Sequence, residues 1–360
     1  MSILGIHHIT MVAANAQRTV DFYTKLLGLK LVKRTVNFDA VDTYHLYFGD
    51  EVGSPGTLLT FFEWPDAARG RWGIGTTHHL ALMVESADDF GELSRAAQLK
   101  WKRWLTDNGV QVTGPYDRRY FRSIYFTDPD GLILEIATSG PGWTIDEPLN
   151  ELGSNVIAPA EELTRKGRNE DVISALTWGE PVAAISEEMA LKKLHHITAI
   201  SSDIFRTTDF YTDVLGFNVV KRTFNYDDPP WPHSYFAVSD FSPGTVMTYF
   251  GYSPNAMRYG SIGIGLTHHV AFAVKDDEAQ REWQDRLRSK GRRVTEVLDR
   301  KYFKSIYFND PDGHILEIAT LGPGFFVDEP RLTLGKNLSL PLWLESERSR
   351  IEQILTPLSV

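Results

Sequence analysis

Residues 117–138 read DRRYFRSIYFTDPDGLILEIAT, and residues 299–320 read DRKYFKSIYFNDPDGHILEIAT. Of the 22 aligned positions 18 are identical, so one segment is a copy of the other. Each copy carries a glutamate, Glu135 or Glu317, inside an apolar run that is typical of a strand. A buried carboxylate is costly unless it is paired or bound to a metal ion. The alternative is that each glutamate forms a salt bridge or lies on an edge strand facing water.

The internal sequence repeat extends over nearly the whole chain. The other matching segments are residues 21–39 with 209–227, where 12 of 19 positions are identical, and the tetrapeptide HHIT at residues 7–10 with 195–198. The duplicated halves therefore cover about residues 1–178 and 189–357. Self-similarity on this scale predicts a repeated structural unit.

Each half contains a finer repeat of strands and one helix. In the first half, a strand from residue 9 precedes a helix over about 20–28, where apolar residues recur at helical spacing and Gly28 gives a stop. Three strand-like runs follow, at residues 29–33, 44–48 and 58–62. The same order starts again at three later points, so we expect four βαβββ modules and an α+β fold.

The repeat predicts two homologous domains with a polar segment between them. The expected divisions are a first domain at 1–150 (modules 1–77 and 78–150), a helical linker at 151–190, a second domain at 191–330 (modules 191–267 and 268–330) and a helical tail at 331–360. The linker is assigned because this stretch is more polar and breaks the strand rhythm of the modules.

Composition and charge narrow the class of protein. The chain has 360 residues, 42% of them hydrophobic, which fits an ordinary globular protein with a buried core. Its formal charge is −10 and no basic stripe stands out, so nucleic-acid binding is disfavoured. No apolar run reaches the ~18 residues of a membrane helix and the N-terminus does not resemble a signal peptide, so we expect a cytoplasmic protein without a membrane segment. Because cysteine is absent, a metal site must use His, Asp or Glu.

Histidine pairs begin all four modules. Eight of the eleven histidines occur in these pairs, which are His7-His8, His78-His79, His195-His196 and His268-His269. A lone strand histidine is usually an ordinary polar group, but a pair at the same point of every module points to a shared function. Because side chains alternate along a strand, we expect one histidine of each pair to face a cavity and the other to face away.

Aligning the modules by their turns shows which of them can supply a carboxylate. Glu135 and Glu317 each lie four residues after a turn glycine, and the other two modules have Thr60 and Thr248 at that position. A site built from two modules therefore contains two histidines and one glutamate. This set is the facial triad of non-haem Fe(II) oxygenases, which leaves positions open for substrate and dioxygen.

Several motifs taken together resemble one known family. They are HHIT at residues 7–10, VKRT at 32–35, YHLYF at 44–48, HHVAFAV at 268–274 and DRK at 299–301. In this combination the chain resembles the ring-cleaving dioxygenases of the vicinal oxygen chelate (glyoxalase/bleomycin resistance/dioxygenase) superfamily, and most closely its hydroquinone-type enzymes. The resemblance spans essentially the whole chain and implies that the four modules form two vicinal oxygen chelate domains.

The resemblance also implies a site shared by the first and fourth modules. Its metal ligands are the second histidine of each pair and the glutamate of the last module, namely His8, His269 and Glu317. The implied catalytic candidates are His7, His268 and Tyr307, and the implied substrate-binding residues are Thr10 and Arg300. In that role Arg300 holds an anionic substrate oxygen or ring substituent.

The mirror set of ligands is intact as well, whereas the family comparison leads us to expect one degenerate site. A second metal site between the third and second modules would use His196, His79 and Glu135, with Thr198, Tyr125 and Arg118 around it. A third arrangement pairs modules within each half, joining His8 to His79 and Glu135, and His196 to His269 and Glu317. The sequence leaves these pairings open, and with them one or two ions per chain.

The expected reaction is the cleavage of a small aromatic diol or hydroquinone by O2. A bound metal lowers the pKa of the substrate hydroxyl, so the ring binds as its anion. His268 or His7 would act as general base or acid, and Tyr307 would donate a hydrogen bond to oxygen species. The expected ion is Fe²⁺, with Mn²⁺ as the alternative.

Two other functions remain open at this point. A glyoxalase-like lyase or isomerase would use Zn²⁺ or Ni²⁺ and normally needs a fourth protein ligand, at the place that Thr60 and Thr248 occupy. A non-enzymatic resistance protein would bind an aromatic drug or quinone in a cleft and would not need histidine and glutamate buried together. Because the edges of open sheets often pair, a homodimer is a further expectation.

Overall fold

The computed structural model describes residues 2–85, 92–238 and 241–360. The chain forms two compact units, one from residues 1–71, 129–131 and 261–360 and the other from residues 72–128 and 132–260. Each unit contains one eight-stranded sheet with a few helices, which confirms the α+β prediction. Within the described residues, no helix is long and apolar enough to cross a membrane.

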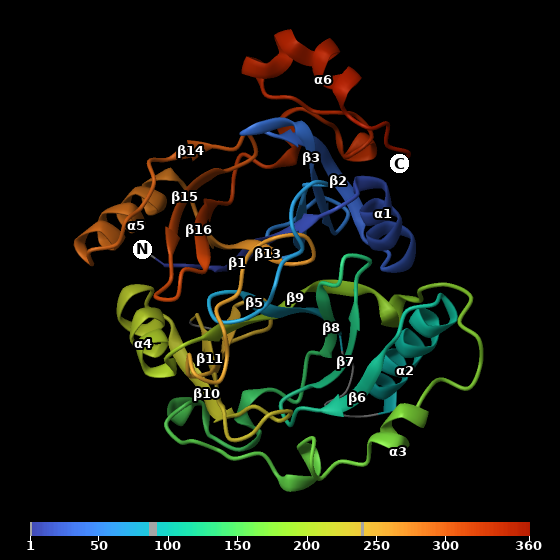
Figure 1. The fold of residues 1–360 in the computed structure, drawn as a ribbon, viewed down its shortest axis with the longest axis vertical. Helices are drawn as coiled ribbons and strands as arrows, with labels where there is room; N and C mark the ends of the chain where they lie inside the picture. Colours follow the sequence, from blue (N-terminus) through green and yellow to red (C-terminus); the bar gives the residue numbers. More distant parts are fainter. Residues whose placement is uncertain (1, 86–91, 239–240) are drawn as a thin grey trace. The chain divides into compact units, whose positions relative to one another are not determined.

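The first unit holds the first and fourth modules in a single sheet (Figure 1). Its strands follow the order β14-β15-β16-β13-β1-β4-β3-β2. Their bounds are Gly5–Ala13 (β1), Lys30–Asn37 (β2), Ala40–Gly49 (β3), Leu58–Glu63 (β4), Thr267–Val274 (β13), Leu298–Asp299 (β14), Lys304–Asn309 (β15) and Ile315–Thr320 (β16). The central strand β1 is fully buried and pairs with β13 antiparallel and with β4 parallel.

Short helices flank this sheet. Asn15 caps α1 (Ala16–Val20) by accepting a hydrogen bond from Arg18 N, and the helix continues as a π-helical turn over Asp21–Leu26, which confirms the helix expected near 20–28. Helix α5 (Asp277–Ser289) packs against β15 and β16 (Figure 1). The remaining helical turns are Phe325–Val327, Arg331–Thr333, Leu342–Glu347 and α6 (Arg348–Ile354).

The second unit repeats the arrangement with the second and third modules. Its strand order is β10-β11-β12-β9-β5-β8-β7-β6. The bounds are Thr77–Val84 (β5), Thr113–Asp117 (β6), Arg122–Thr127 (β7), Ile133–Thr138 (β8), Leu191–Ser201 (β9), Asn218–Phe224 (β10), Pro232–Ala237 (β11) and Val246–Gly251 (β12). Strands β5 and β9 form the centre and pair antiparallel.

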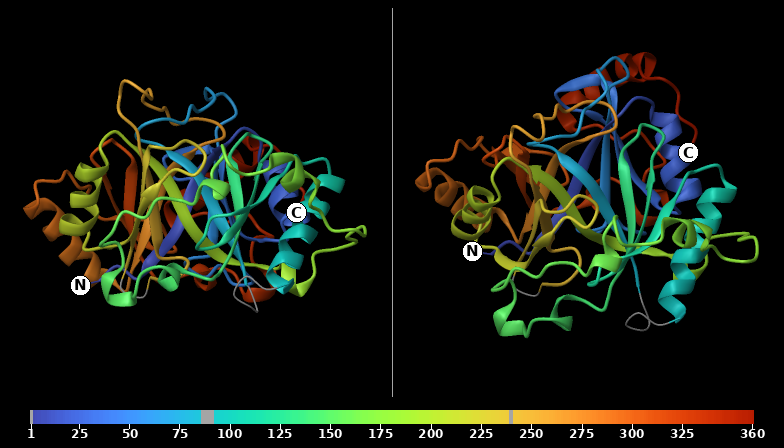
Figure 2. Two further views of the ribbon diagram at one scale, coloured as in Figure 1. Left: turned by 90° about the horizontal axis from the view of Figure 1, so that it is seen from below. Right: turned by 60° about the horizontal axis from the view of Figure 1, so that its bottom comes forward.

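Helix α2 (Glu92–Asp107) contacts β7 and β8 of this sheet (Figure 2). The third module contributes α4 (Ile204–Asp209), which also continues as a π-helical turn, over Phe210–Val214. The segment expected as a helical linker contains only short helical pieces, at Glu161–Leu163, Glu170–Ala175 (α3) and Glu187–Met189, after turns at Trp143–Ile145 and Leu149–Glu151.

Each compact unit therefore combines one module from each half of the sequence. The expected domain boundaries 1–150 and 191–330 follow the sequence repeat and not these units. The physical reason is strand pairing: β1 completes its sheet with β13, and β5 completes its sheet with β9. The pairing of modules within each half, one of the three open arrangements, is wrong.

Each core contains a buried lysine close to aromatic rings. In the first unit Lys33 Nζ lies 5.0 Å from the Tyr302 ring centroid and forms an ion pair with Glu329. In the second unit Lys221 Nζ lies 5.1 Å from the Tyr120 ring centroid and 2.6 Å from a carboxylate oxygen of Glu147. A buried ammonium group is tolerated only with partners of this kind, so these pairs are integral to the cores.

Candidate metal centres

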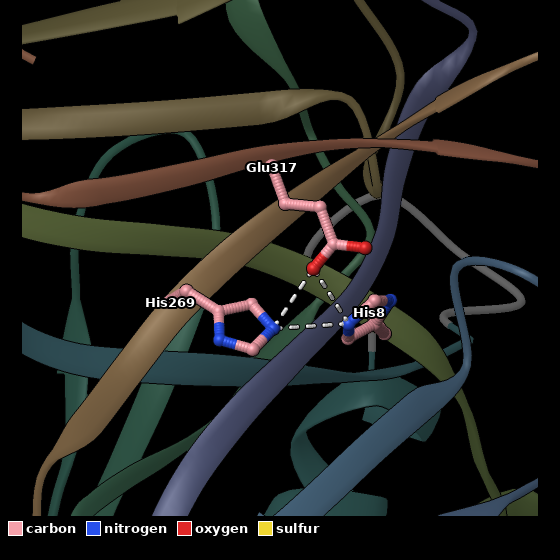
Figure 3. A group of neighbouring side chains, drawn as sticks. All are labelled: His8, His269 and Glu317. Atoms are coloured by element: carbon pink, nitrogen blue, oxygen red, sulfur yellow. Dashed lines mark hydrogen bonds and ion pairs between the residues drawn. The ribbon is translucent and has the colours of Figure 1, made fainter. Parts of the chain in front are cut away.

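Three buried side chains of the first unit converge on one point (Figure 3). His8 lies on β1, His269 on β13 and Glu317 on β16. His269 Nε2 is 2.9 Å from Glu317 Oε2 and 3.3 Å from His8 Nε2, and His8 Nε2 is 3.5 Å from the same carboxylate oxygen. Ligand atoms about 2.1 Å from an octahedral ion are roughly 3.0 Å apart, so this spacing fits a shared metal ion.

Strand register explains why these distant residues meet. His8 lies opposite Ala271 in the β1–β13 ladder, and Ala271 lies opposite Glu317 in the β13–β16 ladder. The three residues thus form one row across three strands, and His269 is two residues from Ala271 on the same face of β13. Because the middle of the row is an alanine, its methyl group leaves room between the histidine and the carboxylate.

A β-bulge occurs at every histidine pair. The β1–β13 ladder skips His7 on one strand and His268 on the other, and the β5–β9 ladder skips His78 and His195 in the same way. The extra residue of a bulge interrupts the alternation of side chains. The expectation that paired histidines face opposite sides is therefore wrong, since the Nδ1 atoms of each pair lie only 2.8–2.9 Å apart.

The contact with His7 fixes the proton on His8. Burial lowers the pKa of His7 to about 3, so its ring is neutral and carries one proton. That proton is donated to the backbone carbonyl of Thr320, which can only accept. His7 Nδ1 must then accept from the Nδ1–H of His8, which leaves the lone pair of His8 Nε2 free for a metal ion.

The carboxylate of Glu317 divides its two oxygens between different tasks. Oε1 accepts a hydrogen bond from Ser305 Oγ at 2.5 Å. Oε2 is buried and has no hydrogen-bond donor among the described residues, although it faces both imidazoles. Burial alone would raise the pKa of Glu317, but His8 and His269 hold it well below its ordinary value. An ionised oxygen without a donor, facing two imidazole nitrogens, is the chemical environment that a divalent cation satisfies.

A chain of polar side chains leads away from this cluster. Thr10 Oγ1 lies 2.9 Å from His269 Nε2 and 2.7 Å from Thr60 Oγ1. Thr60 Oγ1 is 3.1 Å from His45 Nε2, and the Nδ1 atom of His45 is 3.1 Å from the Tyr47 hydroxyl. Thr10 therefore lies beside His269, and Thr60 belongs to a hydrogen-bond chain and offers no carboxylate.

Tyr307 and Arg300 lie on the open side of the cluster. The Tyr307 ring contacts His269 edge-on, with 5.5 Å between the ring centroids, and the Arg300 guanidinium lies 5.5 Å from the Tyr307 ring centroid. Arg300 also pairs with Asp39 at 3.2 Å. The cavity that these residues line together with His8 has a volume of only about 30 Å³. His7 and His268 do not line it; each contacts the next histidine of its pair, His8 or His269.

The second unit carries the mirror cluster in complete form. Glu135 Oε2 lies 3.0 Å from His79 Nε2 and 3.4 Å from His196 Nε2, and all three side chains are buried. Ala81 is the middle residue of the row that joins His196 to Glu135. Glu135 Oε1 accepts from Ser123, and Oε2 again has no hydrogen-bond donor among the described residues. The first cluster and the mirror cluster therefore both fit a divalent cation.

The cavity beside the mirror cluster is much larger than the cavity beside the first cluster. The larger cavity has a volume of about 500 Å³ and reaches both ligand histidines. Arg118 lies in its wall, with Nε 3.2 Å from the Tyr125 hydroxyl and Nη2 2.8 Å from Asp227. Burial raises the pKa of Tyr125, so this hydroxyl keeps its proton and can donate a hydrogen bond. A cavity of this volume falls in the range of small-molecule sites.

Sequence reasoning missed His45 and its counterpart His233. His233 Nε2 lies 2.8 Å from Thr248 Oγ1, which bonds Thr198, so the hydrogen-bond chain is duplicated as well. A signal was present: after the eight paired histidines, only three remain, and two of them are these equivalent residues of the repeat.

Comparisons with known proteins agree with this architecture. A family model described as "Glyoxalase/Bleomycin resistance protein/Dioxygenase superfamily" matches residues 5–136 and 193–318. The chain is 33% identical to "Putative ring-cleaving dioxygenase MhqO" of Bacillus subtilis (strain 168), over 99% of this chain and 97% of that protein. It is 28% identical to "Chlorohydroquinone/hydroquinone 1,2-dioxygenase" of Sphingobium indicum, over 96% of this chain and 94% of that protein.

Solved structures show the same similarity. The crystal structure of a "putative dioxygenase" from Bacillus subtilis superimposes with a TM-score of 0.79 at 33% identity, covering 100% of this chain and 98% of that one. Glyoxalase I from Zea mays gives a TM-score of 0.56 at 16% identity, covering 88% and 92%, and this likeness concerns the fold alone.

Proposed function

The chain belongs to the Glyoxalase/Bleomycin resistance protein/Dioxygenase superfamily, and we propose that it is a metal-dependent dioxygenase that cleaves the ring of an aromatic diol or hydroquinone. In this reaction one carbon–carbon bond of the ring breaks, and both atoms of O2 are incorporated into the product. The observation that carries the proposal is the pair of buried two-histidine, one-glutamate clusters, each with a carboxylate oxygen that lacks a donor among the described residues.

The ligands proposed for the first ion are His8, His269 and Glu317, and those for the second are His196, His79 and Glu135. Fe²⁺ is the ion proposed, with Mn²⁺ as the alternative. A divalent ion held by this ligand set would supply a Lewis acid for the reaction. Full-length similarity to proteins named "Putative ring-cleaving dioxygenase" supports dioxygenase chemistry with such an ion.

The protein's own groups orient the ligands and hold protons. His7 and His268 fix the ring orientation of the ligand histidine that follows each of them, which is the role we assign to them in place of general base. Tyr307 keeps its proton because burial raises its pKa, so its hydroxyl donates a hydrogen bond toward the site. Arg300 contributes positive charge on the same side, and Thr10 Oγ1 lies 2.9 Å from the proposed ligand atom His269 Nε2.

The experiment is a count of metal ions per chain by elemental analysis, on protein purified without oxygen, together with oxygen uptake on hydroquinone. We expect about two irons per chain, with one lost in His8→Ala and a different one lost in His196→Ala. Zinc in place of iron, with no oxygen uptake on any dihydroxybenzene, would support a glyoxalase-like lyase instead. Protein that binds hydroquinone but holds no metal would support a binding protein.

A further inference from the structure

The two clusters have equivalent ligands and very different cavities. The cavity at His8 and His269 has a volume of about 30 Å³, whereas the cavity at His79 and His196 has about 500 Å³. Small-molecule sites have cavities of roughly 300–1,000 Å³, and of these two cavities only the second falls in that range. The clusters therefore differ in which of them can admit a substrate ring.

The extra wall of the second cavity comes from the segment between the halves of the sequence. Arg165, Arg168 and Glu170 from this segment line the second cavity. The equivalent residues of the C-terminal tail include Arg350, which pairs with Glu347 and is exposed. Among the described residues, no part of that tail lines the first cavity. The two halves of the sequence therefore differ in the segment that lines the large cavity.

Aromatic rings and guanidinium groups alternate along this wall. The Arg168 guanidinium lies 4.0 Å from the Tyr116 ring centroid, and the Arg118 guanidinium lies 5.0 Å from the same ring. Tyr116 and Tyr226 replace Leu298 and Phe38 of the first unit, as the repeat aligns them. Contacts of this kind place aromatic rings and positive charge together in the wall, which suits an anionic aromatic ligand.

The wall also carries net positive charge. Three arginines, Arg118, Arg165 and Arg168, and two carboxylates, Asp227 and Glu170, line the cavity outside the metal cluster, which leaves one positive charge. Arg118 pairs with Asp227 at 2.8 Å, and Arg168 pairs with Asp227 at 2.5 Å and with Glu170 at 2.6 Å. The surplus positive charge of the lining therefore corresponds to Arg165. The first cavity contains one such arginine and one aspartate, Arg300 and Asp39, and its lining is neutral by this count.

We propose that the cluster of His79, His196 and Glu135 is the substrate site, and that it takes a hydroquinone-type ring bearing an anionic substituent such as a carboxylate. This inference rests on the proposed ring-cleaving function. The ring lies in the 500 Å³ cavity with a hydroxyl oxygen toward the cluster, and the substituent faces Arg168 and Arg165. The first cluster is the one that does not receive the ring.

The test measures binding separately from turnover, under anaerobic conditions, by calorimetric titration of the full chain. The two probes are 2,5-dihydroxybenzoate and hydroquinone. In Arg168→Gln we expect the dissociation constant for 2,5-dihydroxybenzoate to rise at least fivefold, with less than a twofold change for hydroquinone. Arg168→Lys retains the charge and should recover most of the affinity. The matched control is Arg350→Gln, the equivalent residue of the repeat, which should bind both probes as the native protein does.

Two results would overturn the inference. One is unchanged affinity for 2,5-dihydroxybenzoate in Arg168→Gln. The other is unchanged affinity for both probes in His196→Ala, together with loss of binding in His8→Ala. If binding follows the expected pattern but no oxygen is consumed, the substrate site stands as a binding site and the proposed ring cleavage fails. If oxygen uptake is abolished by His8→Ala and retained in His196→Ala, ring cleavage stands and the choice of site fails.

Discussion

His7 Nδ1 and His8 Nδ1 lie 2.9 Å apart, because the β-bulge at His7 places two consecutive side chains of one strand on the same side. The same contact occurs at the other three pairs. At His7 and His195, which also bond the backbone of Thr320 and Thr138, this contact sets the proton position of the histidine that follows. This relationship is the basis of the first prediction.

Replacing His7 with phenylalanine removes the acceptor for the His8 proton and keeps a ring of similar size. We expect the dissociation constant of the ion at the first cluster to rise about 10–100-fold, the usual effect of losing such a partner. Competition with a chelator measures it, and His195→Phe should give the same change at the second cluster. A His7→Phe protein with normal metal affinity and slow turnover would instead make His7 a general base.

Ser305→Ala tests how the carboxylate is held. The hydroxyl of Ser305 hydrogen-bonds Glu317 Oε1, so its loss frees the carboxylate to rotate away from the imidazoles. We expect about a tenfold or greater loss of metal affinity at the first cluster and little change at the second. Ser123→Ala, which affects Glu135, is the matched variant with the reverse pattern. Equal affinity at both clusters in both variants would contradict this role.

Tyr125→Phe removes a hydroxyl that faces the large cavity. Because burial raises the pKa of Tyr125, the native hydroxyl is protonated and acts as a donor at neutral pH. A hydrogen bond to a charged group contributes about 1.5–3 kcal/mol, so we expect kcat to fall roughly 10–100-fold with KM changed little. Steady-state oxygen uptake measures both constants. Tyr307→Phe is the equivalent change at the first cluster, and a larger effect there would contradict the assignment of the substrate site.

Lys221→Met leaves two buried carboxylates of the second unit without their ammonium partner. Lys221 Nζ lies 2.6 Å from Asp146 and 2.6 Å from Glu147. Removing one member of a buried pair costs about 3–5 kcal/mol, so we expect the free energy of unfolding at pH 7 to fall by that order. Urea denaturation measures it. Lys25→Met removes an exposed pair with Asp21 and should change stability by less than about 1 kcal/mol.

The ion pair between Lys221 and Glu147 also predicts how the stability of the fold changes at acid pH. Burial alone would raise the pKa of Glu147, but hydrogen bonds from Lys221 and the backbone of Asn155 and Gly153 hold it below its ordinary value of 4.5. A folded-state pKa below the unfolded one stabilises the fold above about pH 4.5, and that stabilisation is lost as the pH falls through the folded-state pKa. The native protein should therefore lose more stability between pH 5 and pH 3 than Lys221→Met does. A parallel decline in both proteins would contradict the linkage.

The two clusters of histidine and glutamate could be predicted because their residues violate ordinary rules of composition. A glutamate inside an apolar strand is expensive, and Glu135 and Glu317 stood out for that reason. The recurrence of the histidine pairs was equally visible. The bulges were not predicted, because a β-bulge depends on how two strands match in length, and a single strand sequence carries only the period-two pattern.

The sequence also could not show which modules pair to form each sheet. Because the modules are near copies, β1 has equivalent candidate partners in β5 and β13, and local patterning does not separate them. The difference in volume between the two cavities could not be predicted for another reason. Arg165 and Arg168 lie in an irregular segment whose path over the second sheet is set by backbone hydrogen bonds such as Arg165 N to Tyr226 O.

The pairing of β1 with β13 has a consequence for synthesis on the ribosome. The second unit is almost continuous in sequence, so its cluster is complete once residue 196 has emerged and β9 has paired with β5. The first cluster must wait for Glu317, after His8 has already left the exit tunnel with no partner in reach. Closing so long a stretch of chain is slow, because contacts between residues distant in sequence form late. A growing chain would therefore complete its two clusters one after the other, beginning with the cluster that opens into the large cavity.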